Sequence, residues 1–592
     1  MNRRLLTSVV CVGLALGCGP ASEPETSGGS LADSRAEELV WTFIERTFET
    51  YPTRAVAAGR HDFDSELEDL SVDRLAAWIA FNRQTLEALE EIGSAPDLGL
   101  EARLDLELVE RRARLTLFDL EVLDRASTSP LWWTRVIGNA TVFLLVREDA
   151  PLEQRLNGAL SRARLLSRLT AQAAEALSGS EARVAPEIAT MAARQVRASA
   201  RFYGEGFPQA AGDSLPELGR ELAEAGESAA AALTRLADFL DGLAATADGS
   251  PRLGELYAER FRLATGVSAD VADVLAGAEA ALAAKRDETA AYGRDVWDEV
   301  MGPGEAIPEA DADVVRRLFE RIGDDHAATV DEFVADYESL LAESVEFVRS
   351  HDLITLPEPL TVRTSRSPSF FVGQSVGGVY PAGPYSTSEA KTLFFLPTPS
   401  DSATDEQREG FFRDFNHHFN VMITPHEMVP GHYLQLKMAA RHPRKVRALF
   451  GDGVYIEGWG TFCERLMLDE GWGDSADRLA HLKKQLENIS RTIVDIRVHT
   501  SEISRDEVIE FVRTEAFQEA QFASNMWTRA ITSSPQLTSY YLGYSQVRGL
   551  YDDVREARGD DFQLKEFMDG MMEMGPVPVA RYRERLLGGS QP

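Results

Sequence analysis

The feature that most restricts the possible folds is a helical periodicity that extends over more than half of the chain. Between about Ala32 and Ser350, apolar residues recur at i, i+3, i+4 and i+7, most regularly in Arg74–Ile92 and Asp270–Trp297. Short clusters rich in Gly, Pro and Asp separate the periodic segments, as expected for turns between helices. These patterns predict a mainly α fold with many helices.

A segment of different character begins near Leu353. It is rich in Pro, Gly, Ser and residues that favour strands, so 359–365 and 391–399 are predicted strands. The Gly-rich stretch 375–385 is a predicted loop between them. Helical patterning returns near Asp405 and continues to the C-terminus. The sequence therefore predicts one small sheet in an otherwise helical chain.

The first residues resemble the signal of a bacterial lipoprotein. Arg3 and Arg4 precede the apolar stretch Leu5–Leu16, which is too short to span a bilayer. Cys18 follows almost at once and is the predicted lipidation site. This signal predicts a lipid-anchored protein of the bacterial cell envelope that faces the periplasm or the outside. An ordinary secretion signal with an incidental Cys is the alternative.

Four segments follow from these patterns. They are a signal peptide at 1–18, a disordered Gly/Ser/Pro-rich tether at 19–33, a helical part at 34–352 and a part at 353–592 that carries the sheet. A chain of 592 residues can bury a large core. We expect the two larger parts to form one body that contains a cleft.

Composition excludes several classes of partner. The formal charge of −34 argues against nucleic acid and against electrostatic docking on anionic lipid. Only three Cys are present, and Cys463 alone lies in the body of the chain. An intramolecular disulfide is therefore not expected, although the predicted compartment is oxidising.

The strongest chemical signal is the sequence HEMVPGH. It begins like the zinc-binding pattern H-E-x-x-H with His426 and Glu427, but the expected second His position holds Pro430. The next imidazole is His432, six residues after the first. In a regular helix at roughly 100° per residue, six residues separate two side chains by about 240°, so the two imidazoles could not reach one ion.

The residues between the two imidazoles offer a solution. Pro430 cannot donate a backbone hydrogen bond, and Gly431 tolerates backbone conformations that other residues avoid. We therefore predict a kink or bulge between Met428 and His432 that turns both imidazoles to one metal. The third ligand should lie on a later helix, and Glu457 faces the metal in this prediction.

These residues predict a mechanism. Zn²⁺ is held by His426, His432 and Glu457, with a water in the fourth position and a lowered water pKa. Glu427 is the predicted general base. Glu464, seven residues after Glu457 on the same helical face, is the predicted second carboxylate that orients a ligand imidazole.

A second cluster places Arg491, Asp495 and His499 at i, i+4 and i+8 on one helical face. One interpretation is a surface ion pair with a capping His. The other is functional: His499 donates to the substrate or the oxyanion, and Arg491 is either oriented by Asp495 or meets a substrate carboxylate. The strand at 392–396 is a candidate edge for an extended peptide, with 377–385 as a flexible lid or wall.

Five segments also carry a resemblance, because they occur in the order seen in a large bacterial family. The chain resembles domain-of-unknown-function family 885, many members of which are predicted lipoproteins, over most of its mature length and most clearly from about Phe370. The segments are HEMVPGHYLQ, EGWGTFCERL, RTIVDIRVHT, SPQLTSYYLG and FMDGMMEMGPVPVARYRERLL. The motif H-E-x-x-P-G-H looks like a zincin motif with a two-residue insertion. The family is similar to helical zinc peptidases such as thimet oligopeptidase and carboxypeptidase Taq.

The resemblance implies a zincin-like fold and adds two site residues. The stretch SPQLTSYYLGYSQV is similar to the tyrosine-rich helix of thimet-type oligopeptidases, whose phenols donate to the tetrahedral intermediate. Tyr540 is the first candidate for that donor, and Tyr541 is the second, at the substrate; core aromatic packing is the alternative. Two positions depart from the family pattern, since Tyr433 and Met568 stand where many members have His.

The sequence therefore predicts a zinc-dependent hydrolase, with a peptidase of short peptides as the first choice. A zinc hydrolase of esters or non-peptide amides is one alternative. A lipid-anchored binding protein without turnover is the other, suggested by the missing His at Met568.

Overall fold

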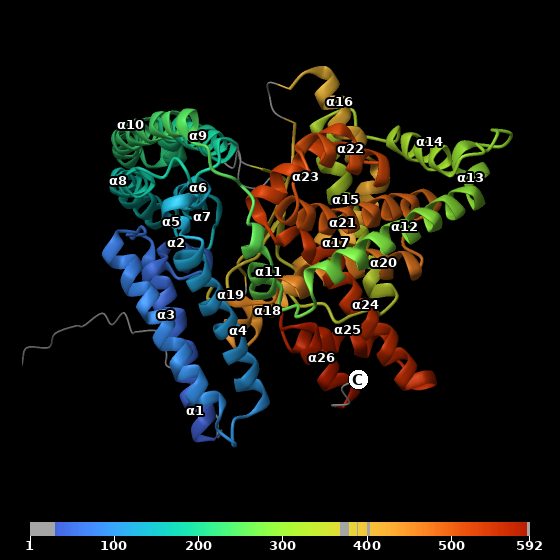
Figure 1. Ribbon diagram of the computed structural model, residues 1–592, viewed down its shortest axis with the longest axis horizontal. Helices are drawn as coiled ribbons and strands as arrows, with labels where there is room; N and C mark the ends of the chain where they lie inside the picture. The colour runs from blue at the N-terminus through green and yellow to red at the C-terminus, as the bar shows by residue number, and fades with distance from the viewer. Residues whose placement is uncertain (1–29, 368–377, 388, 400–402, 589–592) are drawn as a thin grey trace, which may run out of the picture.

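The computed structural model describes residues 30–367, 378–387, 389–399 and 403–588. The fold is mainly α, as predicted, with one small sheet (Figure 1). Cys18 and the predicted signal lie outside the described residues. The predicted tether is too long at its end, because a helix already begins at Leu31. Ser30 caps this helix in a reciprocal pair with Asp33.

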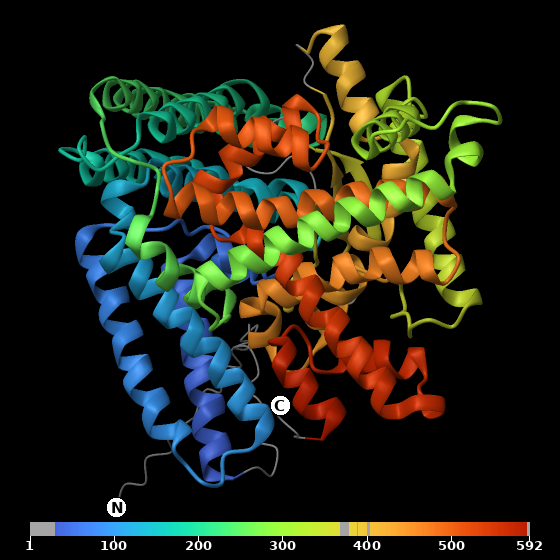
Figure 2. The same cartoon turned by 45° about the vertical axis from the view of Figure 1, so that its right-hand side comes forward.

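Ten α-helices lie between Leu31 and Thr246, in the first part of the chain that the structure describes. The long helices α1, α3 and α4 run side by side, and α8, α9 and α10 pack together beyond one end of them (Figures 1 and 2). The bounds are α1 (Leu31–Thr50), α2 (Pro52–Ala57), α3 (Val72–Gly93), α4 (Leu100–Leu117), α5 (Arg125–Thr128), α6 (Pro130–Asn139), α7 (Val142–Val146), α8 (Leu152–Leu177), α9 (Pro186–Arg201) and α10 (Pro216–Thr246).

The next helices cross to the other side of the molecule. Although they precede the sheet in sequence, α12 and α14 pack on α21 of the C-terminal part. These helices are α11 (Tyr257–Thr265), α12 (Val271–Asp295), α13 (Trp297–Met301), α14 (Asp311–Gly323) and α15 (Val330–Ser350). One apolar core extends from Ala32 to Tyr582. The change of sequence character near Leu353 is therefore not a boundary of the core.

The C-terminal part is again helical and contains the HEMVPGH segment. Its helices are α16 (Asp405–Asp414), α17 (His417–Glu427), α18 (His432–Arg441), α19 (Lys445–Phe450), α20 (Gly453–Asp469), α21 (Ser475–Thr500), α22 (Arg505–Glu515), α23 (Ala520–Ser533), α24 (Ser539–Arg558), α25 (Leu564–Glu573) and α26 (Val579–Leu587). Within the described ranges, no helix combines the length and the apolar character that crossing a membrane requires.

Buried ion pairs join the first part to the last. The guanidinium of Arg447 in α19 is fully buried, and its Nε donates to Oδ1 of Asp105 in α4 at 2.9 Å. Its other nitrogens donate to the Met574 carbonyl (2.7 Å) and to Glu101 (2.6 Å). Asp105 also accepts from Arg444 at 2.7 Å. These contacts hold α4 against the C-terminal helices.

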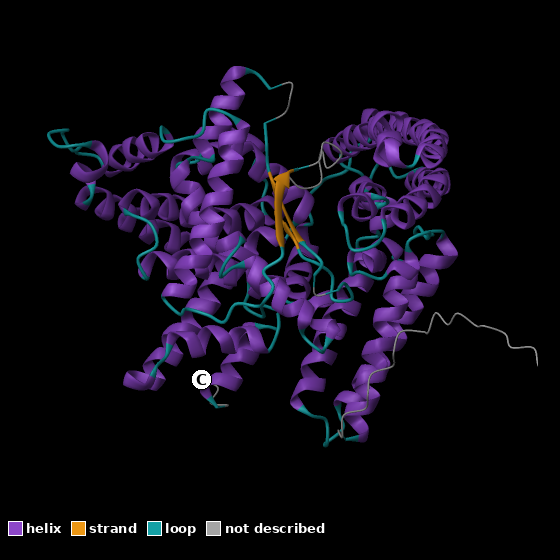
Figure 3. Ribbon diagram, turned by 180° about the vertical axis from the view of Figure 1, so that it is seen from behind, coloured by secondary structure: helices purple, strands orange, loops and turns teal. Residues whose placement is uncertain are grey.

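The sheet lies at the centre of the molecule, between the two parts (Figure 3). Its strands are β1 (Val362–Arg366), β2 (Gly378–Tyr380) and β3 (Thr392–Leu396), in the order β1-β3-β2. The two predicted strands are confirmed. The predicted loop, however, contributes a third strand, because β2 pairs antiparallel with β3.

This order contradicts the predicted peptide-binding edge. β3 is the central strand, paired in parallel with β1 and antiparallel with β2, and all five of its residues are buried. Its backbone groups are therefore occupied, and no extended peptide can add to it.

The predicted flexible lid is attached to the first part of the chain. The Tyr385 N–H donates to the Ala58 carbonyl at 2.9 Å, and Arg147 donates to the Pro381 carbonyl at 2.8 Å. A Cβ on Gly383 would lie 2.1 Å from the Ala58 carbonyl carbon, so only glycine allows this approach. The described part of this segment is a packed wall.

Candidate functional site

The HEMVPGH segment is not one helix. α17 ends at Glu427, Met428 has φ −109° and ψ −103°, and α18 begins at His432. A Cβ on Gly431 would lie 2.0 Å from the His426 carbonyl oxygen, so the chain can turn here only at glycine. The predicted distortion between Met428 and His432 is confirmed, and it is a full break between two helices.

The break is held against α20. The indole nitrogen of Trp459 donates to the Pro430 carbonyl at 2.9 Å, in the buried interior. The Leu434 N–H reaches the Met428 carbonyl at 3.3 Å, which spans the break. α20 therefore fixes the direction in which α18 leaves α17.

The break brings the three predicted ligands together. Oε2 of Glu457 lies 3.8 Å from Nε2 of His426 and 3.6 Å from Nε2 of His432, and the three ligand atoms all lie within 4.8 Å of one another. These separations exceed ordinary hydrogen bonds. Two donors bound to one tetrahedral ion at about 2.0–2.1 Å lie roughly 3.4 Å apart. The residues therefore fit a zinc-sized ion.

Glu464 orients His426, as the sequence predicts. Its Oε1 lies 2.7 Å from Nδ1 of His426 and its Oε2 lies 3.2 Å from Nδ1 of His481. An ionised Glu464 accepts the Nδ1 proton of His426, which leaves the Nε2 lone pair facing Glu457. His481 in α21 gave no recognisable signal in the sequence.

Burial and neighbouring charges shift the pKa values of the three candidate ligands in different directions. Burial, together with the positive charge of His432, lowers the pKa of His426 to about 3. Burial also acts on His432, but its contact with Glu457 raises its pKa to about 8. Burial opposes ionisation of Glu457, yet the two imidazoles lower its pKa to about 2. Such separated pKa values are typical of functional sites.

A polar network fixes Glu457 from the side away from the imidazoles. Gln536, the first residue of a short 3₁₀ helix (Gln536–Thr538), donates from Nε2 to Glu457 Oε1 at 3.2 Å. Arg529 in α23 donates to Oε1 of Gln536 at 2.7 Å, which sets the orientation of the amide. Sequence reasoning identified neither residue.

Tyr540 belongs to the same network. Its hydroxyl oxygen accepts from Gln536 at 3.0 Å and from Arg529 at 3.2 Å, which leaves its own proton free to donate. The guanidinium of Arg491 stacks 4.4 Å above its ring. α24 carries Tyr540 and crosses α20 closely, because Gly458 and Gly543 meet at the crossing.

The match to known proteins extends over nearly the whole chain. The family model described as "Bacterial protein of unknown function (DUF885)" matches residues 52–586. The chain belongs to the DUF885 family. No match is found among curated proteins.

Two solved structures share the fold of this DUF885 protein. One is "a putative lipoprotein of unknown function from Shewanella oneidensis", with 25% identity, a TM-score of 0.76, and coverage of 93% of this chain and 99% of that one. The other is "the putative lipoprotein from Colwellia psychrerythraea", with 15% identity, a TM-score of 0.75, and coverage of 93% and 98%. At 15% identity, the second shows the fold alone.

Two predicted residues of this DUF885 chain lie outside the network. His499 accepts the Leu253 N–H at Nδ1 (3.1 Å), and its Nε2 contacts the Ala530 carbonyl at 2.9 Å. Both ring nitrogens are therefore used, and the ring stacks on Tyr257. The functional prediction for His499 is wrong, since it has no free donor for an oxyanion.

Asp495 does not orient Arg491, so that prediction is also wrong. It accepts from Tyr257 at 2.9 Å and from Ser534 at 2.7 Å. Burial raises its pKa to about 7. Arg491 instead pairs with Glu487 and donates to Asn488 at 3.0 Å. Arg491 and Asp495 both lie on α21, one helical turn apart. At that separation the two side chains contact different neighbouring residues and not each other.

The remaining candidates differ in position. Tyr541 is half-buried against the apolar core, which agrees with the packing alternative. Met568 is fully buried in α25 and Tyr433 is almost fully buried in α18. Glu427 lies at the end of α17, half-buried. Burial, and then the negative charge of Glu427, raises the pKa of Tyr337.

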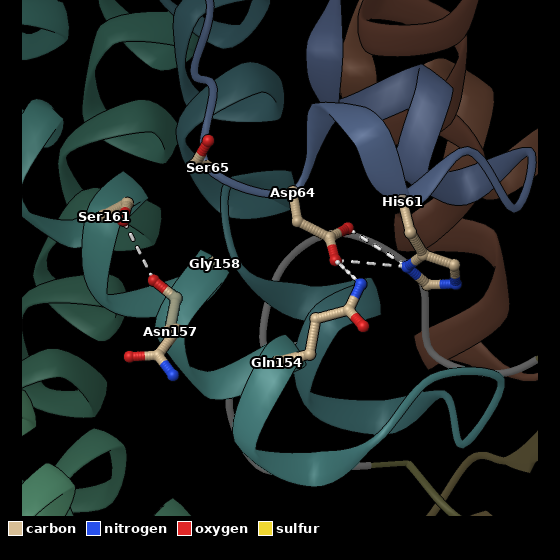
Figure 4. A pocket seen from close by; sticks show the side chains of 7 residues that line it. All are labelled: His61, Asp64, Ser65, Gln154, Asn157, Gly158 and Ser161. Atoms are coloured by element: carbon tan, nitrogen blue, oxygen red, sulfur yellow. Dashed lines mark hydrogen bonds and ion pairs between the residues drawn. The ribbon is translucent and has the colours of Figure 1, made fainter. Parts of the chain in front are cut away.

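Two further clusters of polar side chains occur in the described residues of the DUF885 chain. His418, Asp474 and Asp477 come close together, but Asp474 and Asp477 form the reciprocal cap of α21, and Asp477 accepts from His418 at 2.7 Å. A cavity of about 360 Å³ is lined by His61, which lies 3.1 Å from Asp64 (Figure 4). Neither group includes a residue of the His426 cluster.

Proposed function

We propose that this DUF885 protein is a zinc-dependent peptidase that hydrolyses short peptides. The observation that supports the proposal is the convergence of His426, His432 and Glu457, with Glu427 next to His426 in the sequence, at the end of α17. Two imidazoles and one carboxylate are a common ligand set of catalytic zinc, which keeps one position open for water or substrate.

Hydrolysis requires that water adds to the amide carbon, that the C–N bond breaks, and that a proton reaches the leaving nitrogen. A Zn²⁺ bound here would supply Lewis-acid polarisation and a lowered water pKa. Glu427 accepts the proton of the attacking water and returns it to the leaving amine. Tyr540 donates its free hydroxyl proton to the negative charge that develops on the carbonyl oxygen.

The surrounding residues position these groups. Glu464 holds the His426 ring, and Gln536 with Arg529 holds Glu457. Such contacts behind the ligands fix the ring orientation and raise ligand basicity. We propose that the protein is anchored through Cys18 in the bacterial cell envelope, because the solved relative from Shewanella oneidensis is named as a putative lipoprotein.

The test combines metal analysis with hydrolysis of a quenched fluorescent peptide library. The purified chain should hold one zinc per molecule, lose activity with a chelator and regain it with Zn²⁺. Glu427→Gln should lower kcat by roughly 10²–10⁴-fold while zinc stays bound, since it removes only proton transfer. A protein without stoichiometric zinc, whose activity survives Glu427→Gln, would contradict the proposal.

A further inference from the structure

A large cavity lies next to the His426 cluster. Its volume is about 630 Å³, within the usual range of ligand pockets. Its lining residues come from both parts of the chain: from α2, α4 and α6, and from α11, α21 and α23. Gln536 lines the cavity and also donates to Glu457. One residue, Gln536, therefore links the wall of the cavity to the candidate ligand Glu457.

The wall of this cavity is basic, although the whole chain carries a formal charge of −34. Arginine is the main charged residue of the lining, and the acidic residues there are Glu68 and Asp119. Glu68 is almost fully buried, accepts from the Thr53 N–H at 3.2 Å, and has a pKa raised by its burial. A basic concavity in an acidic protein marks the place where an anion would concentrate.

Four of the lining arginines already have partners. Arg125 donates to Asp119 at 3.1 Å, and Arg260 donates to the same carboxylate. Arg183 donates to Asp124 at 2.8 Å. Arg252 donates to backbone carbonyls, including that of Ser501 at 2.9 Å. Two of these four arginines therefore share the one lining carboxylate, Asp119, that an arginine contacts.

The three other arginines, Arg54, Arg112 and Arg135, have no carboxylate or carbonyl partner in the described parts of the chain. The guanidinium of Arg54 lies 4.7 Å from the Tyr51 ring centroid. Burial, and then the charge of Arg54, lowers the pKa of Arg112 to about 10. The guanidiniums of Arg54 and Arg112 are thus close enough to repel one another, and a bound anion would relieve that repulsion.

We propose that Arg54, Arg112 and Arg135 bind carboxylates of an acidic peptide in this cavity, with the peptide chain extending past Gln536 to the His426 cluster. This inference rests on the proposed peptidase function, because that function makes a peptide the ligand. Guanidinium forks match carboxylates in two-point hydrogen bonds. The carboxylate can belong to Asp or Glu side chains or to the free C-terminus of the peptide.

Peptide binding tests the inference apart from turnover. The full chain carrying Glu427→Gln is titrated into a fluorescein-labelled hexapeptide with two Glu residues, and into its matched Gln version, each with a free or an amidated C-terminus. Fluorescence anisotropy gives Kd. We expect roughly tenfold weaker binding when the recognised carboxylate is removed, and weaker binding at higher salt. Loss with Gln assigns the side chains, and loss with the amide assigns the terminus. Equal affinity for all four peptides would overturn the inference.

Substitutions locate the site. Arg54 and Arg135 are exposed, so Arg54→Gln and Arg135→Gln should fold normally and weaken binding of the acidic peptide alone. Arg112, which is half-buried, is replaced by Gln in a third variant. Arg114→Gln is the control, because Arg114 shares α4 with Arg112 but pairs with Glu110 at the surface. Arginine variants that bind the acidic peptide as tightly as this control would contradict the proposal.

The two proposals can fail separately. If the acidic peptide binds through these arginines but the zinc-loaded wild type cleaves no peptide, the binding site is supported and the peptidase function is refuted. If the wild type cleaves peptides with and without the carboxylates equally well, and the arginine variants bind the acidic peptide as tightly as Arg114→Gln does, the peptidase function is supported and the acidic-peptide site is refuted.

Discussion

Gly460 in α20 lies directly against the imidazole of His426. A Cβ at position 460 would lie 2.9 Å from both Nε2 and Cε1 of that ring. The His426 ring therefore packs directly on the backbone of α20. Glu457 and Glu464, which contact the same ring on either side of this glycine, belong to the same helix.

Gly460→Ala should displace His426 and weaken zinc binding by tenfold or more. The added methyl has no free space, and overpacking of this kind costs about 1–3 kcal/mol of stability. Competition with a chromogenic chelator measures zinc affinity. Gly453→Ala, on the same helix with open space around its Cβ, is the control. Equal zinc affinity in the two variants would refute the packing argument.

Glu464→Gln should lower zinc affinity by roughly 10–100-fold, because the amide no longer orients His426 as a charged acceptor. Glu464 is fully buried, and its replacement by Gln keeps its size. Glu470→Gln changes an exposed carboxylate at the end of α20 and should leave affinity unchanged. Isothermal titration of the apo-protein with Zn²⁺ compares the two variants, and equal values would show that Glu464 does not act on the metal.

Asp105→Ala should lower the free energy of unfolding by about 3–5 kcal/mol, since it leaves the buried guanidinium of Arg447 with less compensation. Urea denaturation followed by circular dichroism measures the free energy of unfolding. The unfolding curve should show one cooperative transition, because the two parts of the chain share a core. Glu49→Ala, which removes an exposed partner of Arg46, should cost less than 1 kcal/mol. Similar losses in the two variants would contradict this account.

Stability should fall between pH 6.5 and pH 9 through His61. Its contacts with Asp149 and Asp64 raise its pKa to about 9. Because the folded-state pKa lies above the ordinary value of about 6.5, the stabilisation is complete below pH 6.5 and is lost as pH rises through 9. His61→Gln should flatten this part of the curve of unfolding free energy against pH. An unchanged slope would exclude the contribution of His61.

Local chemistry made the centre of the site predictable. The spacing of His426 and His432 is incompatible with a straight helix, and Pro430 with Gly431 marks the only nearby place for a break. The structure has that break, and Glu457 and Glu464 occupy the expected face of α20. Each of these inferences needed only helical geometry within one or two neighbouring helices.

Long-range packing determined the rest. Gln536, Arg529 and His481 reach the cluster from helices whose positions no periodicity reveals. The role predicted for His499 was wrong for the same reason. The sequence shows that His499 shares a helical face with Arg491, but it does not show which other segments pack against each turn of that face. The central position of β3 depends on β2, three residues within a Gly-rich segment that lacked a strand pattern.

The central claim is that His426, His432 and Glu457 bind one zinc ion, and anomalous diffraction at the zinc edge tests it most directly. Crystals of the full chain grown with Zn²⁺ should show one strong anomalous peak within about 2.0–2.2 Å of Nε2 of both imidazoles and of a Glu457 oxygen. A peak confined to His418, Asp474 and Asp477, or no peak beside His432, would contradict the account.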